Sequence, residues 1–121
     1  MSHRVLVIED QEDNRRIVRD LLTSAGYTLI EATAGDEGVA LAERERPDLI
    51  LMDIQLPGLD GYEATRRIKA NPELARVPII VVTSYALSGD EAKAMAAGAN
   101  GYVSKPFSPR ALLAKIREHL A

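Results

Sequence analysis

The chain has 121 residues, 46% hydrophobic content and a formal net charge of −3, which together suit one globular domain with its own core and argue against direct binding to nucleic acids. It contains no cysteine, so disulfides, thiolate metal sites and cysteine nucleophiles are excluded and a reducing compartment is favoured. The N-terminus carries no secretory signal pattern and no apolar stretch approaches the roughly 18 residues of a membrane span, so we expect a cytoplasmic protein without membrane insertion.

Five strand-like runs alternate with five helix-like segments from one end of the chain to the other. The strands are expected at approximately Arg4–Ile8, Thr28–Glu31, Asp48–Asp53, Pro78–Thr83 and Gly101–Ser104. The first, third and fourth runs are apolar enough to be covered on both faces, whereas the second has the pattern of an edge strand. This alternation predicts an α/β fold, a doubly wound five-stranded parallel sheet of the flavodoxin-like (βα)5 type with strand order 2-1-3-4-5.

The helical segments have recognisable ends. They are expected at approximately Glu12–Ala25, Gly35–Arg46 and Tyr62–Ala70, and from Ser88 and Ser108 onwards. Gly26 ends the first helix, Ser88 and Glu91 have capping-box spacing, and Ser108 precedes Pro109 at a first helical position. The first helix is expected to bury the stripe Ile17, Val18, Leu21, Leu22 and Ala25. The alanine-rich fourth helix should pack most weakly and move most readily. No linker or repeat interrupts the pattern, so we expect one domain over residues 1–121.

Acidic side chains stand at the ends of the first and third strand-like runs. Glu9 and Asp10 follow the first run, and Asp53 closes the third. Open parallel sheets bind ligands beyond the carboxyl ends of their strands, and in the predicted strand order the switch point lies between strands one and three. We therefore expect the three carboxylates to share one rim of the sheet.

Two further polar residues end the remaining central strands at the same rim. Thr83 ends the fourth strand and Lys105 follows the fifth. Taken singly, each residue has a plain interpretation: Asp53 as a loop carboxylate, Thr83 as a structural hydroxyl and Lys105 as a solvated cation. Their coincidence at four strand ends is what indicates a functional site.

The composition of this rim favours a divalent cation. The loop after the first strand has no GxGxxG or Walker motif, and its acidity would repel a phosphate, so the usual nucleotide-binding folds are excluded. The three carboxylates and Lys105 together carry a charge of −2, which one divalent ion balances. Mg²⁺ is the predicted ion because it prefers oxygen ligands and is often held by one or two carboxylates together with a phosphate.

The residues at these strand ends resemble the receiver domain of bacterial two-component response regulators. Supporting segments are residues 48–57 with Gly61 after them, 78–83 and 97–106. The resemblance covers essentially the whole chain. It implies a stand-alone receiver without an output domain, which acts as a phosphorylation-activated switch in a phosphorelay and not as an enzyme beyond its own phosphorylation and dephosphorylation.

The resemblance implies a role for each residue at the rim. Asp53 would accept a phosphoryl group from a phosphohistidine on a sensor histidine kinase or a histidine phosphotransfer protein. Asp10, Asp53 and the backbone carbonyl of Gln55 would bind Mg²⁺, with Glu9 helping directly or through water. Lys105 would hold a phosphoryl oxygen as a point charge.

The same resemblance implies a conformational switch. Thr83 would move to hydrogen-bond the phosphoryl group, and Tyr102, which would otherwise be interpreted as a packing residue, would rotate inward behind it. This would reshape the face formed by helix four, strand five and helix five, where a downstream signalling protein would bind, and it allows dimerisation on phosphorylation. The Lys105–Pro106 peptide would be cis.

Gln55 and Tyr85 are the residues expected to tune the lifetime of the phosphoryl group. They lie two positions after Asp53 and Thr83, beside the path of a hydrolytic water.

Two rival interpretations remain open. A Mg²⁺-dependent phosphatase with an aspartyl nucleophile would need an acid two residues after the nucleophile, where this chain has Gln55. A phosphorylation-independent scaffold on the same fold is the other.

Overall fold

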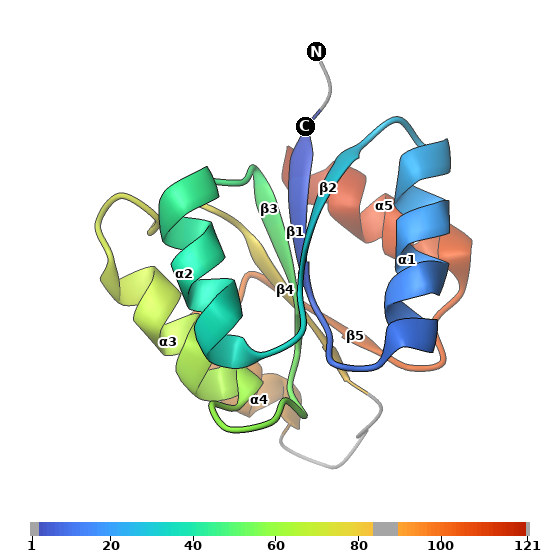
Figure 1. Ribbon diagram of the computed structural model, residues 1–121. Coiled ribbons are helices and arrows are strands. Elements are labelled where there is room, and N and C mark those ends of the chain that lie inside the picture. The colour runs from blue at the N-terminus through green and yellow to red at the C-terminus, as the bar shows by residue number, and fades with distance from the viewer. Residues whose placement is uncertain (1–2, 84–89, 121) are drawn as a thin grey trace.

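A five-stranded parallel sheet forms the centre of the protein (Figure 1). The computed structural model describes residues 3–83 and 90–120. The strands are β1 (Arg4–Ile8), β2 (Thr28–Ala32), β3 (Leu49–Asp53), β4 (Ile79–Thr83) and β5 (Gly101–Ser104). Their order is β2-β1-β3-β4-β5, which confirms the predicted fold class and places β2 at an edge.

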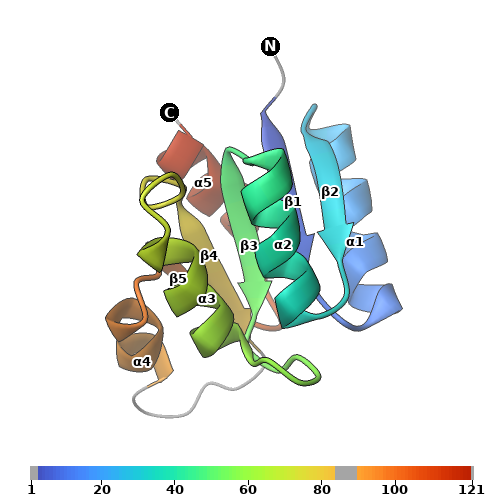
Figure 2. The same ribbon diagram turned by 60° about the vertical axis from the view of Figure 1, so that its left-hand side comes forward.

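Helices cover both faces of the sheet. They are α1 (Glu12–Ser24), α2 (Gly35–Glu45), α3 (Gly61–Ala70), α4 (Asp90–Ala96) and α5 (Pro109–Leu120). Helices α1 and α5 lie on one face, while α2 and α3 lie on the other (Figure 1). Helix α4 lies toward the β5 edge of the sheet (Figure 2).

Alternating side chains of the central strands build two core layers. On β1, Leu6 and Ile8 pack toward α2 and α3, whereas Val5 and Val7 pack toward α1 and α5. Successive residues of a strand point to opposite faces of the sheet, so a strand covered on both faces must be apolar throughout. All five residues of β3 and all five of β4 are buried, as their apolar runs predict.

Within the described residues, the element boundaries agree with the predicted ones or differ by one residue. Gly26 takes a left-handed conformation with φ +93° just after α1, as expected for a glycine past a helix end. Helix α2 stops one residue before Arg46, which is itself the left-handed cap, with φ +48° and a 2.6 Å ion pair to Glu73. Ser108 accepts a hydrogen bond from Ala111 at the start of α5. The predicted start of helix four at Ser88 lies outside the described residues.

Ile17 departs from the predicted core stripe of α1. Its neighbours Val18 and Leu22 are buried, but Ile17 is 55% exposed. Helical spacing places these residues on one broad face, and the edge of that face extends past the sheet into solvent. Among the described residues, no helix is long and apolar enough to cross a membrane.

Helix α4 packs through small side chains. Its buried contact is Ala94, which joins Val81 and Ala99 in a small cluster flanked by Ile54, Tyr62 and Tyr102. Alanine buries little apolar area, so this contact contributes less than those of the leucine- and isoleucine-rich helices. The structure therefore agrees with the prediction that α4 is the most weakly packed helix.

Candidate functional site

The ends of β1 and β3 bring the acidic residues together. The two strands are paired in parallel, with Ile8 opposite Met52, so the residues that follow, Glu9 and Asp53, meet at one rim. Glu9 and Asp53 are 5% and 8% exposed, whereas Asp10 projects into solvent. The backbone N–H of Glu9 donates to the carbonyl of Ala32 on the neighbouring strand, which holds the turn in place.

The three carboxylates form a group suited to a hard cation. One oxygen from each of Glu9, Asp10 and Asp53 lies within 4.8 Å of the others. These donors are all oxygen, and a group of two buried acids beside an exposed one can share a small divalent ion while leaving coordination positions open. The donor chemistry therefore fits Mg²⁺, as the sequence predicts.

Lys105 contacts two of these carboxylates. Its Nζ lies 2.5 Å from Oε1 of Glu9 and 3.5 Å from Oδ2 of Asp53. Its backbone N–H donates to the carbonyl of Thr83 at 2.7 Å, and the Lys105–Pro106 peptide bond is cis. The side chain of Lys105 is 16% exposed, so its interpretation as a solvated lysine is wrong.

Glu9 is electrostatically strained in the absence of a cation. Burial raises the pKa of the Glu9 carboxyl above its ordinary value, and the neighbouring Asp53 raises it further. Lys105 opposes both effects without cancelling them. Like charges at a few ångströms repel by about 4 kcal/mol at an effective dielectric near 20, so a bound cation would relieve this strain.

A tight loop after β3 fixes the position of Asp53. The backbone N–H of Gln55 donates to Oδ1 of Asp53 at 3.3 Å, and the N–H of Gly61 donates to the carbonyl of Ile54 at 2.9 Å. A Cβ on Gly61 would lie 2.1 Å from the carbonyl oxygen of Asp53, so only glycine fits there. The sequence marks Gly61 as part of a motif but does not reveal this contact.

Thr83 and Tyr102 lie on the two strands next to β3. Thr83 is 1% exposed at the end of β4 and pairs in register with Ser104. Tyr102 lies opposite Val81 on β5 and packs against the cluster that anchors α4. The structure thus brings both predicted switch residues to the strands between Asp53 and α4. Tyr85 lies outside the described residues.

A cleft of about 770 Å³ extends from the carboxylates along the side of the sheet. Its polar lining includes Glu9, Asp10, Asp53 and Lys105. Its apolar lining includes Ile17 of α1, Phe107 of the β5–α5 connection, and Pro109 and Leu112 of α5. The exposed Ile17 is thus explained by its place at the edge of this cleft.

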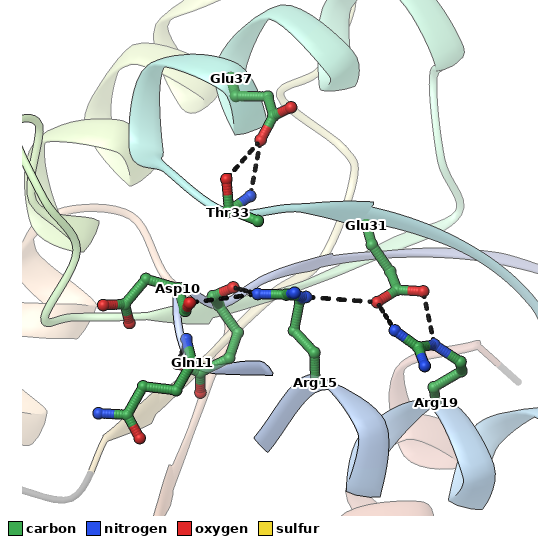
Figure 3. Close-up of polar contacts among 8 residues, drawn as sticks. Asp10, Gln11, Arg15, Arg19, Glu31, Thr33 and Glu37 are labelled. Carbon is green, nitrogen blue, oxygen red and sulfur yellow. Dashed lines mark hydrogen bonds and ion pairs between the residues drawn. The ribbon is translucent and has the colours of Figure 1, made fainter. Parts of the chain in front are cut away.

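Arg15 is a residue that the sequence analysis does not single out. Its side chain extends from α1 toward the loop beside Asp10 (Figure 3), where it donates to the backbone carbonyls of Glu9 and Asp10. The available signal is its position, five and six residues after these two acids, which brings a long basic side chain within reach of the loop.

Comparisons with known proteins agree with this geometry. A family model for the response regulator receiver domain matches residues 5–117. The polar-differentiation response regulator DivK of Brucella ovis is 41% identical over 120 residues, which cover 99% of this chain and 98% of that protein.

Solved structures match over the same length. The receiver domain of the sensor histidine kinase PA1611 from Pseudomonas aeruginosa, with a magnesium ion coordinated in its active site cleft, has a TM-score of 0.93 and 40% identity, covering 99% of this chain and 98% of that one. The chemotaxis protein CheY4 from Vibrio cholerae has a TM-score of 0.93 and 29% identity, covering 99% and 100%.

Proposed function

The chain belongs to the response regulator receiver domain family of two-component signalling, and from this premise we propose that Asp53 accepts a phosphoryl group and thereby switches the protein between two binding states. The observation that carries the proposal is the meeting of Asp53 with Glu9, Asp10 and Lys105 at one rim. A buried carboxylate on a rigid strand end, next to groups that can hold a cation and a phosphoryl oxygen, suits phosphoryl transfer, which depends mainly on positioning and electrostatics.

The phosphoryl donor in this proposal is a phosphohistidine of a sensor histidine kinase or a histidine phosphotransfer protein. A carboxylate oxygen of Asp53 attacks phosphorus, the P–N bond breaks, and its electron pair stays on the departing imidazole, which takes up a proton. The product is an acyl phosphate on Asp53. The exposed Ile17, in the apolar lining of the same cleft as Asp53, supports docking of such a donor at this side.

Mg²⁺ would be held by Glu9, Asp10, Asp53 and the backbone carbonyl of Gln55. When bound, it neutralises charge on the transferred group. Lys105 already contacts both Glu9 and Asp53, so in the proposed reaction it exchanges a carboxylate partner for a phosphoryl oxygen and retains an opposite charge throughout.

The output of the switch would be the face formed by α4, β5 and α5. A phosphoryl group adds charge and acceptor oxygens next to Asp53, which would draw the Thr83 hydroxyl toward them. Tyr102 would follow inward, and weakly packed α4 would shift, changing the surface offered to a downstream signalling protein or to a second phosphorylated copy. Gln55 and Tyr85 would set how fast water removes the group.

We also propose a single-domain, cytoplasmic protein without direct contact to nucleic acid.

The test is incubation with acetyl phosphate or phosphoramidate and Mg²⁺, followed by intact mass and the stability of the adduct in acid and base. One acid-stable, base-labile phosphoryl group is expected on the wild type and none on Asp53→Asn. No adduct, or an equal adduct on Asp53→Asn, contradicts the proposal. Continuous hydrolysis of a small phosphate ester would favour the phosphatase instead.

In the same assay, Tyr85→Ala should shorten the lifetime of the adduct if Tyr85 shields it.

A further inference from the structure

The loop between β1 and α1 is held from below by a side chain of its own helix. Arg15 Nη1 donates to the backbone carbonyl of Glu9 at 3.0 Å and to that of Asp10 at 3.2 Å (Figure 3). These carbonyls belong to the two residues whose carboxylates point into the candidate metal site. Gln11, the N-cap of α1, makes no side-chain capping bond, but its side chain accepts a 3.0 Å hydrogen bond from Asn14 and its N–H donates to Oε2 of Glu9 at 3.3 Å.

The guanidinium of Arg15 is anchored on its other side by a carboxylate on the edge strand. Arg15 Nε lies 3.5 Å from Oε1 of Glu31. Arg19, one helical turn further along α1, binds the same carboxylate with two parallel bonds of 2.8 Å each. Glu31 lies on β2, in register with Val7 of β1, so the contacts connect α1, β2 and the metal-binding loop (Figure 3).

This network is better sheltered than an ordinary surface ion pair. The Arg15 side chain is 14% exposed and that of Glu31 is 29% exposed. Hydrogen bonds from Arg19 lower the pKa of Glu31 and keep it charged. Bidentate, charge-assisted bonds are shorter and stronger than neutral ones, and a planar guanidinium can serve a carboxylate and two carbonyls at once.

We infer that Arg15 is a positioning residue for the metal site, held in place by Glu31 and Arg19, and that it sets the Mg²⁺ affinity of this protein through the backbone of Glu9 and Asp10. The inference rests on the proposed function only in treating these two acids as metal-binding. Mg²⁺ requires near-octahedral geometry at short distances, so a small displacement of the loop moves two carboxylates out of place together.

Two physical effects of Arg15 have opposite signs, which makes the inference testable. Arg15 is a cation close to a cation site, so removing its charge should strengthen Mg²⁺ binding if electrostatics dominates. Removing its hydrogen bonds should weaken Mg²⁺ binding if positioning dominates. Partners outside the coordination sphere commonly change metal affinity by about 10- to 100-fold, whereas screened charges in partly exposed sites have smaller effects.

The experiment measures the dissociation constant for Mg²⁺ by calorimetry or by amide chemical shifts, without a phosphodonor. Arg15→Ala should weaken binding roughly tenfold, the lower end of the range for such partners. Arg16→Ala is the matched control, because it removes the same charge from the next residue, whose side chain is 58% exposed and forms a 4.0 Å ion pair with Asp13. This control should bind as wild type does. Unchanged or tighter binding by Arg15→Ala overturns the inference.

Two further variants cover the case in which Arg15→Ala does not fold. Arg15→Lys keeps the charge but loses the fork, and Glu31→Gln loosens the anchor of Arg15. Both should weaken Mg²⁺ binding, and the effect of Glu31→Gln should disappear in an Arg15→Lys background because both act through one network. Wild-type Mg²⁺ affinity in both Arg15→Lys and Glu31→Gln would overturn the inference. Absence of an aspartyl phosphate on wild type would overturn the proposed function alone, because Mg²⁺ affinity is measured independently of phosphorylation.

Discussion

At the scale of single residues, we expect Glu9 to couple proton binding and stability to the proposed binding of Mg²⁺. Its raised pKa means that the folded, metal-free protein holds a proton on Glu9 at pH values where the unfolded chain has released it. The free energy of unfolding of the metal-free protein should therefore fall as the pH rises from about 4.5 through the folded pKa. If the proposed function holds, a cation bound at neutral pH would relieve this cost, because it would offset the buried charge of Glu9.

Glu9→Gln should separate these effects. Without the buried charge, metal-free Glu9→Gln should be more stable than wild type at pH 7 and should lose the downward slope above pH 4.5. Its Mg²⁺ affinity should fall by about tenfold or more, since one oxygen anion is lost from the site. Denaturant titrations from pH 4 to pH 8 check the first result, and calorimetry checks the second. A metal-free variant less stable than wild type at pH 7 would show that the Lys105 ion pair outweighs the strain.

At the scale of elements, the β3–α3 loop joins Asp53, the proposed phosphoryl acceptor, to the start of α3 and leaves no room for a side chain at Gly61. Gly61 lies against the backbone of Asp53 and Ile54, and Asp60 caps α3 by accepting a hydrogen bond from Glu63. Gly58 in the same loop has φ +73°, but a Cβ there would meet nothing within 4 Å. The two glycines thus serve different purposes, close approach at Gly61 and a left-handed turn at Gly58.

Alanine substitutions should distinguish the two glycines. Gly58→Ala should cost about 1 to 2 kcal/mol, the usual strain of a left-handed residue, and should leave phosphorylation by acetyl phosphate unchanged. Gly61→Ala should cost more, because its Cβ would force the loop away from Asp53, and should slow phosphorylation severalfold or more. Thermal unfolding and the phosphorylation time course measure both. Equal phosphorylation rates in the two variants would contradict the positioning role of Gly61.

The helices also show what a pattern of residue types predicts well and poorly. The alanines of α4 predict a weakly packed helix, and the small cluster around Ala94 agrees. The apolar stripe of α1 predicts a buried Ile17, and the structure exposes it. Periodicity reports which residues share a helix face, but the width of the surface that covers this face depends on neighbouring elements.

At the scale of the whole molecule, metal binding should stabilise the fold, because the site joins β1 and β3 and the unfolded chain cannot form it. A ligand at 100 times its dissociation constant stabilises by about 2.7 kcal/mol. Saturating Mg²⁺ should raise the midpoint of thermal unfolding of wild type at pH 7.5, and the rise should be smaller near pH 4.5, where Glu9 is protonated. Scanning calorimetry with and without Mg²⁺ tests this. Asp53→Asn is the control and should show a smaller rise. An equal rise in wild type and Asp53→Asn would place the ion elsewhere.

The sequence alone predicts most of the secondary structure and most of the candidate site residues. Apolar runs, helical spacing and turn residues are local patterns, so they predict the five strands, the helices and the strand ends at which Asp53, Thr83 and Lys105 stand, while the strand order came from the fold class that this alternation indicates. The resemblance to receiver domains added the family, which the comparisons show.

Only the tertiary structure decided which of these groups touch. Lys105 donates a hydrogen bond to Glu9, which is 96 residues away in the sequence. Gly61 lies directly against the backbone of Asp53. The Arg15 contacts could not be predicted from the sequence either, because they join a side chain to backbone carbonyls, which every residue has. Long-range distances follow from how the sheet aligns its strands and not from any local pattern, so only the folded chain shows that Glu9 and Asp53 share Lys105 as an ionic partner.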